Sequence, residues 1–290
     1  MTPLESLRLR SDTLRAARGF FNARGFLEVE TPLLADEAIP ETHIDPFEVP
    51  GGGWLQASPE LHMKRLLAAG SGSIYQITRS FRAGEVGPQH RPEFTIVEWY
   101  GVGDDMQAGM RLLSDFCQTA AGAPPATHVT YGEAFQQHAG IDPFESPTTD
   151  LIAAADLDDT QDRDLLLDAL SSKVHEKLGQ AAPEILYHYP AAQSALATTT
   201  TDENGHAVAE RFELFWRGIE LANGYHELTD PAELRRRFES VHAARRSSGK
   251  TTSPMPESLL GAMESGLPAC AGVALGFDRL LMAMTGAEHL

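Results

Sequence analysis

Residues 73–101 read SIYQITRSFRAGEVGPQHRPEFTIVEWYG, and this stretch decides the fold. Its first ten and last nine residues are rich in β-branched and aromatic side chains, and two apolar sets alternate along the second run. Between them lies a polar stretch, residues 83–91, that contains two glycines and a proline. Two strand patterns joined by such a loop predict an antiparallel hairpin.

A second hairpin is predicted at residues 211–228, which read RFELFWRGIELANGYHEL. A tight turn at 217–218 pairs Phe215 with Glu220. Glu213 then lies on the sheet face of Glu220 as a diagonal neighbour. Two carboxylates on one face repel each other unless a cation lies between them, and Mg²⁺ bound to phosphate oxygens is the economical candidate. The alternative is an exposed acidic hairpin, which the apolar residues on both faces disfavour.

Glu227 lies seven residues beyond Glu220, so strict alternation places the two carboxylates on opposite faces. Asn223 and Gly224 are typical of a β-bulge, which inserts one residue and reverses the alternation. We therefore expect an irregularity at these two residues that returns Glu227 to the face of Glu220.

The remaining chain predicts helices around a largely antiparallel sheet, which is an α+β fold. We expect helices at about 2–23, 58–70 with Ser58 as N-cap, 104–121 with Asp104 as cap, 130 onward with a Thr130–Glu133 capping box, 161–178, 230 onward and 276–284, and further strands at 26–32, 184–190 and 272–275. Neither a βαβ alternation nor a phosphate-binding glycine loop after a strand is present in the sequence. Residues 1–290 fit one catalytic domain with a helical insertion at about 123–183.

The bulk composition limits the class of protein. The net charge is −18, from 23 basic and 41 acidic residues, which argues against broad nucleic-acid binding. The sequence has no apolar run of membrane-spanning length and no signal-peptide pattern at its start. Cys117 and Cys270 are distant in sequence and lie among apolar residues, so we expect free thiols in a reducing cytoplasm.

Two stretches carry groups suited to a phosphate ligand. Arg82 ends one strand of the first hairpin, His90 lies in its loop and Phe94 begins the next strand, so cations and an aromatic ring converge. In GVALGFDRLLM, residues 272–282, a glycine at the strand end allows close approach of a ligand and Arg279 presents a guanidinium. The alternatives are a solvated loop with chance charges and a buried strand–helix turn.

The order of these stretches resembles a known family. GFLEVETPLL, then the FR…H.PEF pattern, then GVALGFDR look like motifs 1, 2 and 3 of the class II aminoacyl-tRNA synthetases, and SPELHMKRLL with GIELANGYHEL resembles the lysyl branch. The resemblance covers nearly the whole chain. It implies the antiparallel class II sheet, ATP as substrate, Mg²⁺, and a homodimer built on motif 1.

The resemblance also implies residue roles. Arg82 grips the α-phosphate of ATP, His90 and Arg279 hold the distal phosphates, and Phe94 stacks adenine against Arg279. Motif 2 usually has Glu two residues after its Arg, whereas Gly84 stands here with Glu85 next. The implied ATP site is Arg82, Ala83, Gly84, Glu85, His90, Phe94, Glu220, Leu221, Gly276 and Arg279; Glu213 and Glu220 bind Mg²⁺; the amino-acid site is Ser58, Pro59, Glu60, Tyr100, Asn223, Glu227 and Ala274.

Within the lysyl branch, the chain resembles the stand-alone paralogs that attach (R)-β-lysine to a lysine of translation elongation factor P. On this resemblance we expect the chain to begin at the catalytic domain, without the anticodon-binding OB domain. Ser58 stands where the synthetases usually carry Ala, and Ala274 where motif 3 usually has Gly, and both replacements reshape the amino-acid pocket.

Two other hypotheses remain. One is an enzyme that attaches lysine to tRNA or to a small molecule, which the charge of −18 and the missing OB domain disfavour. The other is a non-catalytic paralog, which the retained Arg82, Glu213, Glu220 and Arg279 disfavour. The segment 141–170 has nine acidic residues and one arginine. It is interpreted as a solvated face, with docking of a protein acceptor as the alternative.

Overall fold

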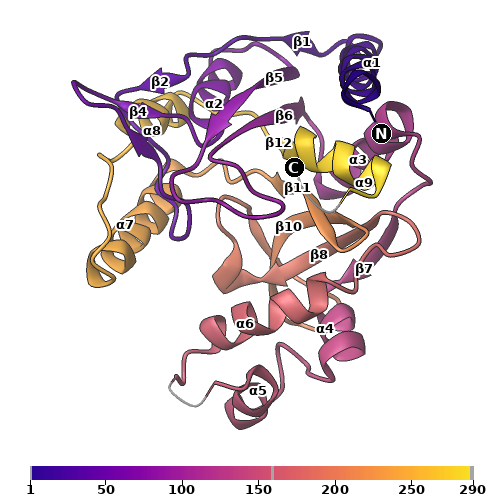
Figure 1. Ribbon diagram of the computed structural model, residues 1–290. Helices are drawn as coiled ribbons and strands as arrows, with labels where there is room; N and C mark the ends of the chain where they lie inside the picture. Colours follow the sequence, from indigo (N-terminus) through magenta and orange to yellow (C-terminus); the bar gives the residue numbers. More distant parts are fainter. Residues whose placement is uncertain (1, 158–159, 288–290) are drawn as a thin grey trace.

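The computed structural model describes residues 2–157 and 160–287 (Figure 1). Within them, a nine-stranded sheet has the order β1-β5-β6-β12-β11-β10-β8-β7, with β9 beside β10, and a three-stranded sheet has the order β2-β4-β3. The helices are α1 (Pro3–Asn22), α2 (Glu60–Ala68), α3 (Met106–Ala121), α4 (Tyr131–Ala139), α5 (Thr148–Ala155), α6 (Arg163–His175), the 3₁₀ turn η1 (Ala191–Gln193), α7 (Pro231–Ser247), α8 (Glu257–Glu264) and α9 (Phe277–Thr285). The strands are β1 (Leu27–Glu28), β2 (Leu34–Ala35), β3 (Phe47–Glu48), β4 (Trp54–Leu55), β5 (Ile74–Phe81), β6 (Glu93–Val102), β7 (Thr127–Thr130), β8 (Glu184–Pro190), β9 (Thr199–Thr201), β10 (Ala207–Trp216), β11 (Ile219–His226) and β12 (Cys270–Gly276).

The centre of the main sheet is antiparallel throughout, from β5 across to β8. Parallel pairing occurs at the two ends of the order, between β1 and β5 and between β7 and β8. Helices flank this sheet, so the predicted α+β class is confirmed (Figure 1).

The hairpin predicted at 73–101 is formed by β5 and β6. Its register runs from Ile74 opposite Tyr100 to Phe81 opposite Glu93 without a shift. The ladder therefore continues to the mouth of the loop 83–91, which gives the residues at the strand ends a rigid base.

The hairpin predicted at 211–228 is formed by β10 and β11, with Phe215 opposite Glu220 as expected. Arg217 and Gly218 make the turn with φ of 57° and 72°. Positive φ at both central residues is the geometry of the tight type I′ turn, whose twist matches that of the strands.

The bulge predicted at Asn223 and Gly224 was placed wrongly. The ladder between β11 and β12 passes through both residues without a shift. The shift against β10 comes earlier: Phe215 opposes Glu220 but Leu214 opposes Ala222, so Leu221 is the inserted residue.

The bulge at Leu221 reverses the alternation of the strand, which was the effect predicted for a bulge at Asn223 and Gly224. Leu221 and Ala222 both pack into the core under α3, so the alternation reverses between Glu220 and Asn223. Glu227 therefore shares the face of Glu220. Gly224 is small for a different reason, because a Cβ there would lie 2.4 Å from the ring of Phe212.

The first strand is much shorter than predicted. We expected residues 26–32, but β1 pairs with β5 only at Leu27–Glu28. Beyond it the chain leaves the sheet edge, and the Thr31 hydroxyl donates to the side chain of Gln76 at 3.0 Å. Pro32 has no N–H with which to continue a ladder.

Two predicted helix caps are displaced by one residue. The side chain of Asp105, not that of Asp104, caps α3. Asp104 belongs to the preceding turn, in which its N–H donates to the carbonyl of Gly101 at 3.2 Å. Ser58 likewise precedes the cap position of α2, which Pro59 holds, but its Oγ accepts from the N–H of Glu60 at 3.1 Å, so the predicted capping bond is present.

The predicted helical insertion at 123–183 contains α4, α5 and α6, which pack around a separate apolar core and lie together below β7 and β8 in Figure 1. Thr130 and Glu133 form the predicted capping box. The insertion is not wholly helical, because β7 joins the edge of the main sheet. Residues 158 and 159, two of the nine acidic residues, lie outside the described residues.

Helices α1, α3 and α9 cover one face of the sheet with its largest core. Aromatic rings dominate this core: the ring centres of Phe21 and Tyr75 are 4.5 Å apart, and those of Trp99 and Phe116 are 5.3 Å apart. The opposite face is only partly covered. Helices α2, α7 and α8 cover one part of it with an apolar cluster of their own, and the insertion covers another part with the separate core described above. The site lies between them.

Candidate active site

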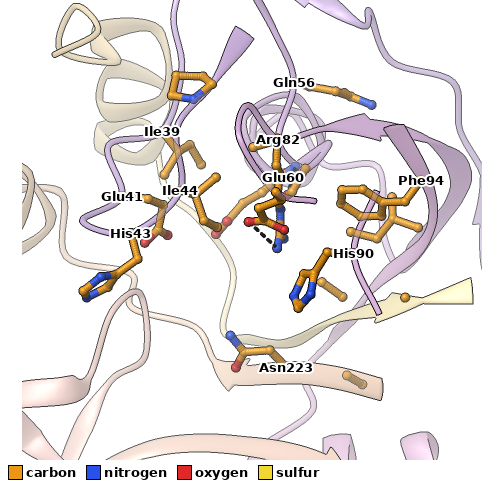
Figure 2. Close-up of a pocket in the computed structure, with 18 of the residues that line it drawn as sticks. Ile39, Glu41, His43, Ile44, Gln56, Glu60, Arg82, His90, Phe94 and Asn223 are labelled. Carbon is orange, nitrogen blue, oxygen red and sulfur yellow. Dashed lines mark hydrogen bonds and ion pairs between the residues drawn. The ribbon is translucent and has the colours of Figure 1, made fainter. Parts of the chain in front are cut away.

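The partly covered sheet face forms the floor of a cavity of about 410 Å³. The segment 35–46, the start of α2, the loop 83–91 and the start of α9 form its walls (Figure 2). The predicted site residues that line it are Ser58, Glu60, Arg82, Glu85, His90, Phe94, Glu213, Glu220, Leu221, Asn223, Ala274, Gly276 and Arg279. Pro59, Ala83, Gly84, Tyr100 and Glu227 are not among the residues that line it.

Arg82 is held directly after the end of β5. Its N–H donates to the carbonyl of Pro92 at 2.9 Å, and its guanidinium carbon lies 5.0 Å from the ring centre of Phe94. Its nearest carboxylate is that of Glu85, at 3.7 Å. Among the described residues Nε has no hydrogen-bond partner. A fixed guanidinium with an unused donor suits a phosphate or carboxylate ligand.

Arg279, in the first turn of α9, is fixed by three acceptors from two other elements. Its guanidinium donates to the carbonyl of Gln89 at 3.2 Å, to the carbonyl of Glu220 at 3.0 Å and to Nε2 of His90 at 2.6 Å. Burial, followed by the charge of Arg279, lowers the pKa of His90. The geometry therefore assigns a neutral imidazole that accepts from Arg279. His90 and Arg279, the two residues predicted to bind the distal phosphates, thus lie together and carry one positive charge between them.

The two carboxylates predicted to bind Mg²⁺ both line the cavity. Glu213 accepts from Arg211 at 2.5 Å, and although burial opposes ionisation, Arg211 holds the pKa of Glu213 below its ordinary value. Burial and the charge of Glu213 raise the pKa of Glu220, whose carboxylate is 3.8 Å from Arg279. The two carboxylates are thus electrostatically coupled.

This pair fits a cation that is shared with a ligand. No group of three or more acidic, His or Cys side chains that could hold a metal occurs in the described parts of the chain. Mg²⁺ in phosphate-transfer sites is commonly bound through one or two carboxylates together with phosphate oxygens. Glu213 and Glu220 match that donor set, and a divalent ion would relieve the repulsion that raises the pKa of Glu220.

Behind Glu60 lies a buried ion triad. Nζ of Lys64 is 2.6 Å from Glu60 and 2.7 Å from Glu227, and the side chains of Lys64 and Glu227 are each 1% exposed. Burial disfavours the ammonium, but the two carboxylates outweigh it and raise the pKa of Lys64. Burial also raises the pKa of Glu227 to about 7, against the opposing effect of Lys64.

Tyr100 belongs to the same acidic region. Its hydroxyl donates to Glu98 at 2.8 Å, and both residues are almost fully buried. Burial, followed by the charge of Glu60, raises the pKa of Glu98 to about 8. Buried carboxyl groups ionise unfavourably unless a cation is nearby, so a group of them favours a cationic ligand.

Comparison with known proteins agrees with this geometry. Residues 3–290 match the family model described as tRNA synthetases class II (D, K and N). The chain belongs to this family.

Three curated relatives of this chain share one description. Proteins from Mannheimia succiniciproducens, Salmonella dublin and Salmonella paratyphi B, each 44% identical to it, are named elongation factor P–(R)-β-lysine ligase. In each comparison the alignment covers 99% of this chain and 93% of the relative. The resemblance expected from the three motifs is confirmed.

Glycine occupies two positions of the class II motifs for different physical reasons. Gly84, where motif 2 usually has Glu, has φ +77°, a conformation that strains other residues. A Cβ on Gly276 would meet only the side chain of Arg279, at 3.6 Å, which is an ordinary contact. The fold itself therefore tolerates a larger residue at Gly276, which is consistent with close approach of a ligand there.

Sequence reasoning missed several groups of the synthetase site. The position of Glu98 could have been predicted from the sequence, since strand alternation places it on the same face as Phe94. The same holds for Arg211, two residues before Glu213 on the same strand. It does not hold for Lys64, because its helical spacing from Glu60 is equally typical of a surface ion pair. Glu41, on the cavity wall, lies outside all three motifs.

Proposed function

We propose that this protein is an ATP-dependent ligase that activates (R)-β-lysine, or lysine, as an aminoacyl-adenylate and transfers it to a lysine side chain of elongation factor P. The observation that carries the proposal is 44% identity over 99% of the chain to ligases of that name. The gathering of Arg82, Arg279, Glu213 and Glu220 around one cavity supports it. Residues 1–290 are proposed to act as one catalytic domain.

In the first step a carboxylate oxygen of the amino acid attacks the α-phosphorus of ATP in line, and the bond to the bridging oxygen breaks to release pyrophosphate. Arg82 binds the α-phosphate and offsets the charge that develops there. Arg279, oriented by His90, binds the distal phosphates. Catalysis is mainly positioning and electrostatic stabilisation.

In the second step the amine of the acceptor lysine attacks the carbonyl carbon of the adenylate. The bond to the phosphate oxygen breaks, AMP leaves, the amine loses its proton and an amide forms. Glu213 and Glu220 would hold Mg²⁺, which supplies positive charge to the phosphate oxygens. Ala83, Gly84, Glu85, Phe94, Leu221 and Gly276 are proposed to surround the adenine and ribose.

The amino acid is proposed to bind beside the acidic region. Ser58, Pro59, Glu60, Tyr100, Asn223, Glu227 and Ala274 are the proposed contacts. Glu227 lies on the sheet face of Glu220, which supports a role towards the distant ammonium of a lysine-like substrate. Lys64 already neutralises part of this charge, so the ammonium would share Glu227 with it.

A homodimer through motif 1 is part of the proposal. Leu4 and Leu7 on α1 and Leu27 on β1 are 56%, 66% and 56% exposed. Apolar side chains exposed on one helix and on the strand that follows it support a covered face.

A reducing cytoplasm is also part of the proposal. Both cysteines, Cys117 and Cys270, are buried free thiols, and burial raises the pKa of each to about 12, so both are unreactive. Within residues 2–157 and 160–287 no helix is long and apolar enough to cross a bilayer.

One assay tests the function against its alternatives. The protein is incubated with ATP, Mg²⁺ and lysine or (R)-β-lysine, then with elongation factor P or tRNA, and the products are weighed by mass spectrometry. A mass gain on elongation factor P is expected. A gain on tRNA alone would favour an aminoacyl-tRNA synthetase, and absence of pyrophosphate exchange with any amino acid would favour a non-catalytic paralog.

A further inference from the structure

Glu41 is a carboxylate on the cavity wall that no motif explains. It lies in the segment 35–46 with Ile39, His43 and Ile44, on the side of the cavity opposite Phe94 and His90 (Figure 2). Its side chain is partly buried, and no hydrogen bond or ion pair to its carboxylate occurs among the described residues.

The surroundings of Glu41 make a lone negative charge unfavourable. Burial, followed by the charge of Glu60, raises the pKa of Glu41 to about 7, against the opposing effects of Arg211, Arg82 and Lys64. Glu41, Glu60 and Arg82 all line the same cavity. A cationic ligand between the two carboxylates would relieve this repulsion.

Other acceptors in the cavity are also unused. Gln56 is 8% exposed, and its Oε1 has no hydrogen-bond partner in the described residues, while its Nε2 donates to the carbonyl of Arg79 at 2.8 Å. Oδ1 of Asn223 is buried and likewise unpartnered there. Both residues line the cavity with Glu41. Buried acceptors without donors indicate a ligand that brings N–H groups, and an ammonium brings three.

The backbone around Glu41 is fixed rather than loose. Arg245 of α7 is 4% exposed and donates to the carbonyls of Glu41 at 2.8 Å and Ile44 at 3.1 Å and to the carboxylate of Asp45 at 2.6 Å. The N–H of Ala83, next to Arg82, donates to the carbonyl of Asp45 at 2.7 Å. The wall that carries Glu41 is thus tied to the residue following the proposed phosphate ligand.

Depth divides the carboxylates of the cavity into two groups. Glu98 and Glu227 are 1% and 3% exposed and lie behind the lining residues, whereas Glu41 and Glu60 line the cavity itself. A diamino acid whose carboxylate lies at Arg82 and whose side chain points inward would bring its distant ammonium to the buried pair. Its other ammonium, close to the carboxylate, would then lie beside the wall.

We propose that Glu41, together with Glu60, forms the subsite that binds the ammonium nearest the carboxylate of the amino-acid substrate, and that Glu41 is a specificity-determining residue. This inference rests on the proposed function. The site selects a carboxylic acid that carries one ammonium close to the carboxylate and another at the far end.

The experiment compares Glu41→Gln with the wild type in ATP–pyrophosphate exchange. Glu48→Gln is the matched control. Glu48 lies seven positions after Glu41 and its side chain is exposed, so this substitution removes the same charge from the surface. The KM for (R)-β-lysine and for ATP is measured, with inhibition constants for two analogues that each retain one amine. These are 3-aminohexanoate, which keeps the near amine, and 6-aminohexanoate, which keeps the far one. Thermal unfolding verifies that the variants fold.

In Glu41→Gln the KM for (R)-β-lysine and the inhibition constant of 3-aminohexanoate should rise about tenfold or more, because a charged hydrogen bond is lost. The inhibition constant of 6-aminohexanoate and the KM for ATP should stay at the wild-type values, and Glu48→Gln should match the wild type throughout. An unchanged KM for (R)-β-lysine, an equal rise for 6-aminohexanoate, or a rise confined to ATP overturns the inference while leaving the proposed function intact. Absence of exchange by the wild type with every amino acid overturns both.

Discussion

At one end of the cavity Arg82 and Arg279 are partly accessible, 25% and 19% exposed in their side chains, and are held by carbonyls, an imidazole and an aromatic ring. At the other end Glu98, Glu227 and Lys64 are almost fully buried; Lys64 pairs with Glu227, and Glu98 accepts from the hydroxyl of Tyr100. We call these the cationic end and the acidic end.

The two ends should differ in whether a substitution lowers activity or folding stability. These two guanidiniums make their closest contacts with neutral groups, and their nearest carboxylates are 3.7 and 3.8 Å away, so they retain charge for a ligand. Their removal should therefore affect activity more than folding. Charges buried together depend on one another, so removal of one leaves an unpaired charge in an apolar setting. Five predictions, ordered from the largest expected effect to the smallest, test this division.

Arg82→Ala should have the largest effect, at the cationic end. We expect adenylate formation to fall at least about a thousandfold, roughly 4 kcal/mol in the activation free energy, because the charge of the transition state loses its nearest cation. Pyrophosphate exchange measures this. The matched control is Arg79→Ala, which removes an exposed arginine from β5, the strand that Arg82 directly follows. Near-normal exchange by Arg82→Ala would refute its phosphate role.

Lys64→Met should lower the free energy of unfolding by about 3 kcal/mol or more, because Glu60 and Glu227 lose their shared cation. Urea unfolding measures the change, and the exposed Lys177→Met is the control.

The double variant Lys64→Met with Glu227→Gln should recover part of that stability, because it also removes the charge left unpaired. A double variant less stable than Lys64→Met would show that the loss comes from packing, and the proposed contrast between the two ends would fail.

Glu98→Gln should change how stability depends on pH. The pKa of Glu98 is raised to about 8 in the folded protein, above its ordinary value, so the folded state binds this proton more tightly than the unfolded state does. The wild type should therefore lose stability as pH rises from about 4.5 to about 8, by up to roughly 1.4 kcal/mol per pKa unit of the shift. The Gln side chain still accepts from Tyr100 but does not titrate. Unfolding curves at about pH 5 and about pH 8 should show a smaller loss for the variant, and equal losses would contradict the assigned titration.

Ala274→Gly should have the smallest effect. Ala274 lines the cavity on β12, and removal of its methyl group should shift the ratio of kcat/KM for lysine over (R)-β-lysine several-fold towards lysine. Ala271→Gly, on the opposite face of the same strand, tests the backbone cost of glycine alone. An unchanged ratio in Ala274→Gly would show that this position does not shape the pocket.

The cationic end was the more predictable of the two. Arg82, Phe94 and Arg279 lie at the ends of strongly patterned strands or at a helix start, where local sequence specifies position, and His90 lies in the loop between two such strands. All four line the cavity. The acidic end was predicted in part. Glu60 and Glu227 were expected near a substrate, but Lys64, which joins them, was not.

The bulge shows why local patterns were insufficient at the acidic end. Asn223 and Gly224 favour an irregular strand, yet Leu221 is the inserted residue because it and Ala222 both fill the core under α3. Packing against a distant helix selected the register. Sequence preference alone gave the right face for Glu227 through the wrong residue.

The sequence by itself determined the α+β class, the two central hairpins and the family, because strand alternation, turn residues and motif order are local properties of the chain. Tertiary structure decided which charges share one desolvated space. Lys64 meets Glu227 across 163 positions of sequence, and Arg245 fixes the wall of Glu41 across 204. Such contacts depend on how the helices pack against the sheet. The low dielectric of the packed interior strengthens the interactions between these charges and shifts their pKa values.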